Sequence, residues 1–174
     1  SDCPFKQHAV DFWKLSYFWM GINLRDVIKL QWSNVHDDKI YYYRSKTFKR
    51  SKVKRKNTVF LDDRTTDVID KYRGTGSFIF NVLDDSMSEE QKYRAGKNFI
   101  RKINQHLKKV AVELDISTDI SSIWSRHSFA TEMKKKKVSP YIIQEAFGHK
   151  DIKTTENYMS SLVEEDLRGV QKML

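Results

Sequence analysis

The chain has 174 residues, of which 39% are hydrophobic and 13% aromatic, which is enough for one domain with a packed core and excludes a disordered basic tail. Lysine and arginine outnumber acidic residues by 32 to 23, and the net charge of +9 favours a polyanionic partner bound in a salt-sensitive way. The single cysteine, Cys3, excludes an internal disulfide and a cysteine-rich zinc site, and the lack of a long apolar run gives no support for a membrane span, so we expect a reduced, cytoplasmic setting.

The first half of the chain predicts two helices followed by a small sheet. An aromatic-rich helix is expected over 4–20, and a second over 24–31 after a turn at Gly21. Segments 39–43 and 57–61 are rich in β-formers, and we expect them to pair as an antiparallel hairpin.

The middle of the chain predicts a short helix over 63–72, a third short strand over 78–80, and one long helix. Ser88 followed by Gln91 has the spacing of a capping box, which starts the long helix. Apolar residues at helical spacing then predict its packed face: Phe99, Ile103, Leu107, Val110 and Leu114.

The last third is predicted to be helical throughout. One helix is expected over 122–135, and another is opened by the pair Ser139-Pro140 and stopped by Gly148. A helical tail follows from Thr154. These elements predict a mainly helical α+β fold with a small antiparallel sheet, in a single domain over residues 1–174.

The segment between the two expected strands is strongly basic. Of the thirteen residues from Arg44 to Lys56, eight are lysine or arginine and none is acidic. Such charges repel one another on a two-stranded ribbon unless phosphates lie among them. We therefore expect a hairpin that reaches into a DNA groove, with a solvated loop as the alternative. The expected DNA-binding residues are Arg44, Lys49, Arg50, Lys52, Lys54 and Arg55.

Three residues near the C-terminus have the chemistry of phosphoryl transfer without a metal. Arg126 lies in Ser-Arg-His-Ser-Phe-Ala-Thr, His149 follows Gly148, and Tyr158 comes nine residues after His149. A phenol is a nucleophile, a guanidinium holds phosphate charge, and an imidazole donates to a phosphate oxygen. The paired acids Asp62-Asp63 and Asp84-Asp85 are typical of loops and caps, so we expect no metal and no cofactor.

This pattern resembles the C-terminal box of the tyrosine recombinases, or phage integrases, which reads His-x-x-Arg-His, then Leu-Gly-His, then a tyrosine nine residues on. The chain departs at the first histidine, where it has Ile123. The resemblance implies site-specific DNA recombination through a 3′-phosphotyrosyl bond formed by Tyr158, with Arg126 and His149 stabilising the transition state. If Ile123 occupies the histidine position, water, Lys46 or His149 would substitute for it, whereas His127 is expected to brace the site structurally.

Two further catalytic residues are implied by the resemblance. Arg44-Ser45-Lys46-Thr47 resembles the family's strand with a catalytic lysine before a threonine, so Lys46 would protonate the leaving 5′ oxygen, with Lys49, Lys52 and Lys54 as rivals. Arg25 is the candidate for the family's first arginine. If Asp26 matches the family's glutamate, that arginine position holds Asn23, and a residue of the basic hairpin would supply the cation. The pattern is similar to recombinases of Bacteroides-type mobile elements.

The resemblance also implies partners and missing parts. The chain would be the C-terminal catalytic domain, without the family's N-terminal core-binding domain, and its start without methionine suggests a fragment of a longer protein. Double-stranded DNA and a homotetramer on DNA are the expected partners. The apolar residues of the tail pack either on the domain's own core or on a neighbouring subunit: Val163, Leu167, Val170 and Leu174. The alternatives are a catalytically impaired DNA-binding module and a type IB topoisomerase-like enzyme.

Overall fold

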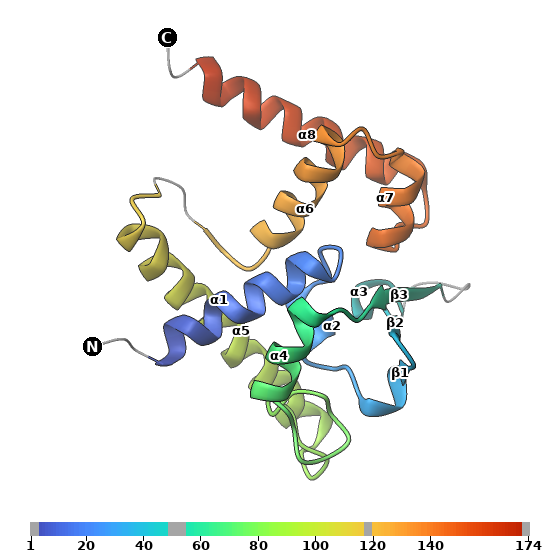
Figure 1. Ribbon diagram of the computed structural model, residues 1–174, viewed down its shortest axis with the longest axis vertical. Helices are drawn as coiled ribbons and strands as arrows, with labels where there is room; N and C mark the ends of the chain where they lie inside the picture. Colours follow the sequence, from blue (N-terminus) through green and yellow to red (C-terminus); the bar gives the residue numbers. More distant parts are fainter. Residues whose placement is uncertain (1–3, 49–54, 117–119, 172–174) are drawn as a thin grey trace.

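The computed structural model describes residues 4–48, 55–116 and 120–171, with side chains described in the same ranges except at 47–48 and 162–171. Within these ranges the fold is mainly helical with one small sheet, as predicted (Figure 1). The elements in chain order are α1 (Pro4–Phe18), α2 (Leu24–Val27), the 3₁₀ turn η1 (Trp32–Asn34), β1 (Val35–His36), β2 (Lys39–Tyr43), α3 (Ser45–Phe48), β3 (Lys56–Phe60), α4 (Asp63–Lys71), α5 (Glu89–Glu113), α6 (Trp124–Lys135), α7 (Pro140–Phe147) and α8 (Ile152–Gln171).

Helix α1 lies at the centre of the molecule, against α4, α5 and α6 (Figure 1). Phe12 on this helix and Trp19 just after its end are buried in the main core, at 0% and 1% exposure, whereas Trp13 and Tyr17 are half-buried. The helix ends two residues earlier than expected, because Met20 and Gly21 adopt left-handed φ angles of 55° and 71° in succession. This turn places Gly21 against Arg126, a residue of the candidate site.

Helix α2 is one turn long, so the expected helix over 24–31 is wrong in length. The side chain of Asn23 caps it by accepting from the backbone N–H of Arg25 at 2.9 Å. The chain then turns, and the Leu30 carbonyl accepts from the N–H of Ile79 at 2.9 Å. A backbone partner far along the chain has overridden the local helical pattern.

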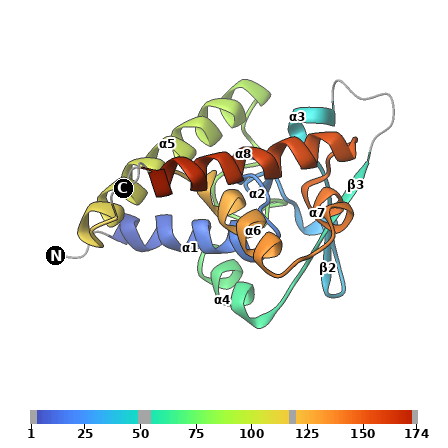
Figure 2. The ribbon, with the colours of Figure 1, turned by 90° about the horizontal axis from the view of Figure 1, so that it is seen from above.

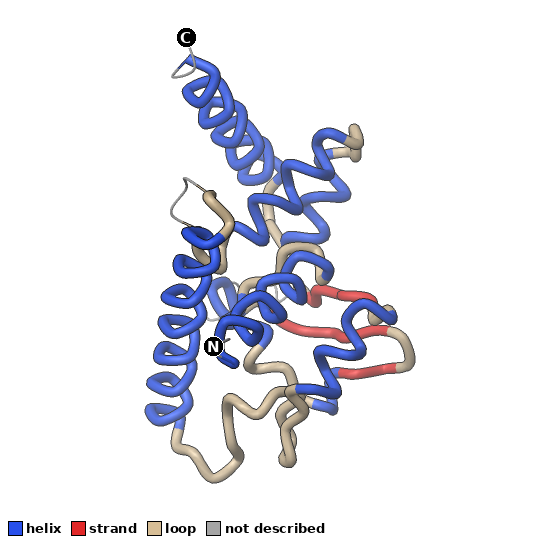
Figure 3. The backbone as a smooth tube through the Cα atoms, turned by 60° about the vertical axis from the view of Figure 1, so that its left-hand side comes forward, coloured by secondary structure: helices blue, strands red, loops and turns tan. Residues whose placement is uncertain are grey.

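The sheet is antiparallel, in the order β1-β2-β3 (Figure 3). The two expected strands pair in a register that sets buried Ile40 opposite buried Val59. Strand β1 was not expected, and the strand predicted over 78–80 is wrong. That segment makes only isolated bridges, through Phe78 and Phe80, and it closes a loop.

Helix α5 begins with the predicted capping box between Ser88 and Gln91. Its predicted face packs into the core at Phe99, Ile103 and Leu107, and Ala111 continues it. The expectation for Leu114 is wrong: the side chain is 65% exposed, because it follows the last helical residue at the C-cap.

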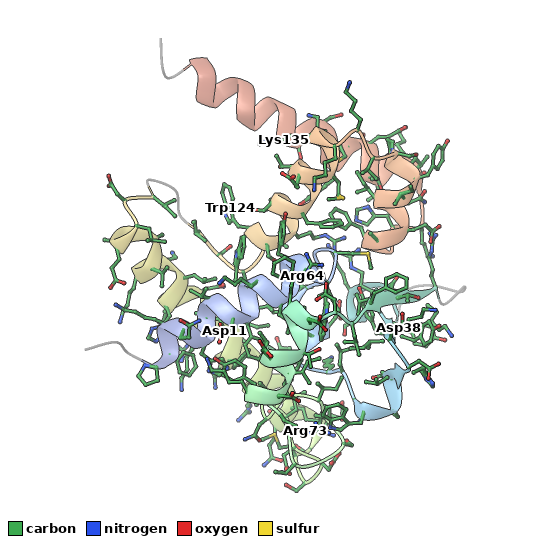
Figure 4. All side chains as sticks on the ribbon, in the orientation of Figure 1. Asp11, Asp38, Arg64, Arg73, Trp124 and Lys135 are labelled. Carbon is green, nitrogen blue, oxygen red and sulfur yellow. The ribbon has the colours of Figure 1, made fainter. Side chains whose placement is uncertain are left out.

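Helices α6, α7 and α8 enclose a second, smaller apolar cluster built on Ala130, Ile143 and Phe147. Helix α7 also packs on β3, and α8 contacts both α6 and α7 before it runs out past the body of the domain (Figures 1 and 2). In Figure 4 the labels Trp124 and Lys135 mark the two ends of α6. No helix in the described part of the chain has the length and apolarity to cross a membrane.

Candidate functional site

The three residues of the C-terminal pattern meet at the seam between the two apolar clusters. Arg126 lies in the first turn of α6, His149 directly follows the glycine that ends α7, and Tyr158 lies in the second turn of α8. The His149 and Tyr158 ring centroids are 6.4 Å apart, and Arg126 is hydrogen-bonded to His149. Three helices therefore bring together the side chains whose spacing suggested a common site.

The Arg126 guanidinium is almost fully buried, at 5% exposure, and its nitrogens bind carbonyls from both clusters. Nη1 donates to the Gly21 carbonyl at 2.9 Å, and Nη2 donates to the Phe147 carbonyl at 3.1 Å. The guanidinium also lies 3.6 Å from the centroid of the Phe147 ring. Burial, followed by the charge of Arg44, lowers the pKa of Arg126 to about 10, so the group remains a cation at neutral pH.

His149 is held by both of its ring nitrogens. Nε2 lies 3.3 Å from Nη2 of Arg126, and Nδ1 lies 2.9 Å from the Thr155 hydroxyl. Since a guanidinium only donates, Nε2 accepts, which leaves the proton on Nδ1 to be donated to Thr155. Burial lowers the pKa of His149 to about 4, with smaller contributions from Arg126, Arg44 and Lys46, and so keeps the ring neutral.

The depressed pKa of His149 predicts a loss of stability in mild acid. Between pH 6.5, its ordinary pKa, and about 4, the unfolded chain binds a proton at this site that the folded chain does not. The free energy of unfolding should therefore be fully retained above 6.5 and fall as the pH drops through that window, by a fraction of the roughly 1.4 kcal/mol per pH unit that one proton can contribute.

Urea denaturation at several pH values would measure this dependence. His149→Gln should flatten the slope, whereas His36→Gln, at an exposed histidine on β1, should keep the wild-type slope. Identical slopes in the wild type and His149→Gln would contradict a neutral, buried His149. His8 also has a pKa lowered by burial, so some dependence should persist in both variants.

Gly148 sets the position of His149. It ends α7 with a left-handed φ of 61°, and a Cβ there would meet the buried side chain of Asn57, 2.8 Å from Nδ2. We expect Gly148→Ala to lower the free energy of unfolding by about 2–3 kcal/mol, since backbone strain and a clash add together. In an Asn57→Ala background only the strain should persist. A double-mutant cycle of the wild type, Gly148→Ala, Asn57→Ala and the double variant, measured by urea denaturation, therefore separates the strain from the clash.

The Tyr158 ring is part-buried between the aromatic residues of α6 and α7. It meets Phe147 edge-on at 5.5 Å, and it is stacked on His127 at 5.4 Å with an interplanar angle of 16°. Its hydroxyl lies 2.7 Å from Nδ1 of His127. The expected nucleophile is thus fixed in direction by a histidine that was expected only to brace the site.

Arg44, Lys46 and Arg25 line one pocket of about 400 Å³, together with Asn23, Asp26, Ile100 and Ser122. Arg44 also reaches Arg126: its Nη1 lies 3.5 Å from the Phe147 carbonyl that Arg126 binds. Lys46 lies on the single turn of α3 directly after β2, and not on a strand as the resemblance implied. Arg25 is exposed at the pocket wall.

The remaining expected DNA-binding residues divide into two groups. Arg55 braces the site from β3's start: its Nη1 donates to the His149 carbonyl at 2.8 Å, and Nη2 pairs with Glu145. Lys49, Arg50, Lys52 and Lys54 lie outside the described residues. The DNA-groove prediction therefore stays a prediction for them.

The structure adds two residues that the sequence reasoning did not place in the site and gives a third a new contact. Thr155 orients His149 and Arg44 joins Arg126, whereas His127, expected to brace the site, lies within hydrogen-bond distance of the Tyr158 hydroxyl. A signal existed for His127, which lies four residues after Ile123 and so on the same face of a helix. No comparable signal existed for Arg44 or Thr155, because their partners come from other elements.

The acidic pairs have ordinary structural roles. Asp62 caps α4, and Asp84 and Asp85 bind the backbone N–H groups of Ser86 and Ser77. Among residues 4–48, 55–116 and 120–171, no three His, Cys, Asp or Glu side chains form a cluster that could hold a metal ion.

Comparison with known proteins identifies the family and the fold. The model of the phage integrase family matches residues 19–165. No curated protein matches the chain in sequence. The fold is similar to that of XerA recombinase, with a TM-score of 0.59 and 16% identity, over 94% of this chain and 61% of that one. It is also similar to XerH site-specific recombinase bound to difH substrate in a pre-cleavage complex, with a TM-score of 0.59 and 13% identity, over 91% of this chain and 45% of that one. This chain thus spans about half to three fifths of the length of these structures.

Proposed function

The chain belongs to the phage integrase family, and we propose that it cuts and rejoins DNA strands at a specific site through a 3′-phosphotyrosyl intermediate on Tyr158. One observation carries the proposal: the phenol of α8, the buried guanidinium of α6 and the neutral imidazole just after α7 come together, with a second guanidinium beside them. The Tyr158 ring lies 5.5 Å from the Phe147 ring, and the Arg126 guanidinium lies over that same Phe147 ring. This closeness of Tyr158 to Arg126 supports its role as the nucleophile.

Arg126 and Arg44 would hold the scissile phosphate. Both guanidiniums approach the Phe147 carbonyl, at 3.1 and 3.5 Å, so their charges repel one another at close range. Because a bound phosphate relieves that repulsion, the pair favours an anion between its forks. Asn23, which matches the position of the family's first arginine, carries no charge and caps α2. Arg44 would then supply the missing cation. Arg25 is the rival from the same pocket.

Lys46 would protonate the departing 5′ oxygen. It shares a pocket with Arg44, and its positive charge contributes to the lowered pKa of His149, so it lies within electrostatic range of the phosphate site. His149 would exchange its bond with Arg126 for one to a non-bridging phosphate oxygen, as the neutral tautomer that carries its proton on Nε2 and accepts from the Thr155 hydroxyl at Nδ1.

The complete reaction would be two transesterifications that need no nucleotide. Tyr158 replaces the 5′ oxygen at phosphorus, and a 5′ hydroxyl from another strand then replaces Tyr158. The bond energy stays in the phosphotyrosine between the two steps. No residue in this scheme requires a metal ion.

The substrate would be double-stranded DNA, and the active assembly a homotetramer of a longer protein. This chain would form its catalytic domain, preceded by an N-terminal core-binding domain that clamps the DNA from the other side. Because the sequence resembles recombinases of Bacteroides-type mobile elements, some of which also depart from the family's first arginine, we propose that the DNA that is integrated is a mobile element.

The test uses the full-length protein and nicked DNA that carries the attachment site of its element. The nick lets the cleaved strand diffuse away, so a covalent intermediate accumulates as a detergent-resistant protein–DNA band. A band supports the proposed strand transfer, and an adduct peptide that contains Tyr158 identifies the nucleophile. DNA binding without any band, at several salt concentrations, would contradict it.

A catalytically inactive DNA-binding module is the second candidate, and one observation favours it. Ile123 stands at the position of the family's proton-transferring histidine, where it is 40% exposed and has no group that can move a proton. If nothing replaces that function, the domain would bind DNA without cutting it. The covalent-adduct experiment separates the two candidates.

A further inference from the structure

The hydroxyl of Tyr158 has a proton acceptor that the family resemblance does not predict. We infer that His127 is the general base for Tyr158, an inference that rests on the proposed role of Tyr158 as nucleophile. Its Nδ1 lies 2.7 Å from the phenolic oxygen, which is within direct proton-transfer distance. His127 therefore touches the reacting atom itself.

The position of His127 on α6 explains how it replaces the missing histidine. Its backbone N–H donates to the Ile123 carbonyl at 3.2 Å, so the two residues are one helical turn apart on the same face. Arg126, the preceding residue, points into the seam while His127 faces α8, and helices α6 and α8 lie in contact. The proton acceptor, His127, thus lies one helical turn after the position where the family has its histidine, and it contacts Tyr158.

The other candidates are occupied or have the wrong protonation state. His149 uses Nε2 to accept from Arg126 and donates Nδ1–H to Thr155, so neither nitrogen is available to Tyr158. Lys46 is an ammonium in its proposed role and has no lone pair to offer. The expectation that His149 or Lys46 substitutes for the missing histidine therefore loses its geometric basis.

The geometry of the histidine–tyrosine pair also favours transfer of the proton from the Tyr158 hydroxyl to Nδ1 of His127. The two rings are within 16° of parallel, and the Trp124 ring meets His127 edge-on at 5.8 Å, so the imidazole packs between two aromatic rings. Nδ1 accepts when the proton of the neutral ring is on Nε2.

The protons balance through both steps. During cleavage the Tyr158 O–H bond breaks, its proton passes to Nδ1, and the phenolate oxygen forms the bond to phosphorus. The bond from phosphorus to the 5′ oxygen breaks, and that oxygen takes a proton from Lys46. During rejoining the neutral Lys46 amine takes the proton of the attacking 5′ hydroxyl, and the His127 imidazolium returns its proton to the leaving Tyr158 oxygen.

The test compares two nicked substrates with the full-length protein. One has a normal scissile phosphodiester, and the other has sulfur in place of the bridging 5′ oxygen. A thiolate, whose conjugate acid has a pKa of about 8.5, leaves without a proton, so this substrate no longer needs the acid but still needs the base. We expect His127→Ala to slow cleavage of both substrates equally, by about 10²–10⁴-fold, whereas Lys46→Ala should be slow only on the oxygen substrate.

Added imidazole provides a readout that a purely structural role would not move. It should accelerate cleavage by His127→Ala in proportion to its concentration, because it can enter the space left by the side chain. The matched control, His36→Ala at an exposed site on β1, should cleave at the wild-type rate and not respond to imidazole.

The outcomes separate this inference from the proposed function. No adduct in the wild-type protein means that the proposed function fails. A wild-type adduct with undiminished cleavage by His127→Ala overturns the inference alone, and faster cleavage overturns it by showing that His127 restrains Tyr158. Recovery of His127→Ala on the sulfur substrate also overturns it, since His127 would then act on the leaving group.

Discussion

Tyr158→Phe is expected to abolish covalent attachment of the full-length protein to nicked DNA, with a loss of about 10⁴-fold or more in the rate of cleavage. The substitution removes the attacking oxygen and leaves the ring, so the edge contact with Phe147 at 5.5 Å and the stacking on His127 at 5.4 Å persist. The lost hydrogen bond should lower the free energy of unfolding by only about 0.5–1.5 kcal/mol. DNA affinity should be unchanged, and gel electrophoresis under denaturing conditions measures the adduct.

Tyr141→Phe is the matched control. Tyr141 lies on α7 and is 67% exposed, so its hydroxyl is far less constrained than that of Tyr158. The control should form the adduct at the wild-type rate. An adduct that persists in Tyr158→Phe and disappears in another tyrosine variant would assign the nucleophile elsewhere.

Replacing Arg126 should reduce both catalysis and stability. Arg126→Gln removes a buried cation from the phosphate site, and we expect cleavage to fall by about 10³–10⁵-fold, as when a single arginine that stabilises a phosphoryl-transfer transition state is lost. It also removes the side-chain donor of the Gly21 carbonyl and leaves the Phe147 carbonyl with the longer bond from Arg44. A buried carbonyl without a partner costs about 1–3 kcal/mol, so the free energy of unfolding should fall by about that amount.

Arg126→Lys tests whether the charge alone suffices. An ammonium cannot bind two carbonyls and a phosphate through one planar fork, so most of both losses should persist. Arg94→Gln is the control, because Arg94 forms only an exposed ion pair with Glu90 on α5 and should change stability by less than about 1 kcal/mol. Cleavage must be measured where each variant is folded, as urea titration establishes. Wild-type cleavage by Arg126→Gln would remove Arg126 from the reaction.

The parts of this fold that were predictable from sequence depend on local chemistry. The capping box of Ser88 and Gln91 starts α5, and the left-handed Gly148 stops α7, because caps and stops act through the residues next to them. The places of Arg126 and Tyr158 on helices, and of His149 just after the glycine that ends a helix, were also predictable from the local pattern. Their meeting at one site depends on the docking of those helices.

The parts that were missed depend on contacts between distant segments. Segment 78–80 has the composition of a strand, yet its backbone closes a loop against Gln31 and Arg73. Arg44 was assigned to a DNA groove, because nothing near it in sequence indicates that it reaches the Phe147 carbonyl on another element. His127 was expected to brace the site, because the partner of its Nδ1 lies 31 residues away on α8.

The attachment of Arg126 to both apolar clusters has a consequence for the folding chain. The Gly21 carbonyl belongs to the turn after α1, whereas the Phe147 carbonyl belongs to the end of α7, and only docking of one cluster on the other brings both within reach of one guanidinium. In a newly made or locally opened chain, Tyr158 would lie apart from the Arg126 cation of the proposed site. Strand cleavage by the proposed reaction would therefore require both clusters to be folded and docked on one another.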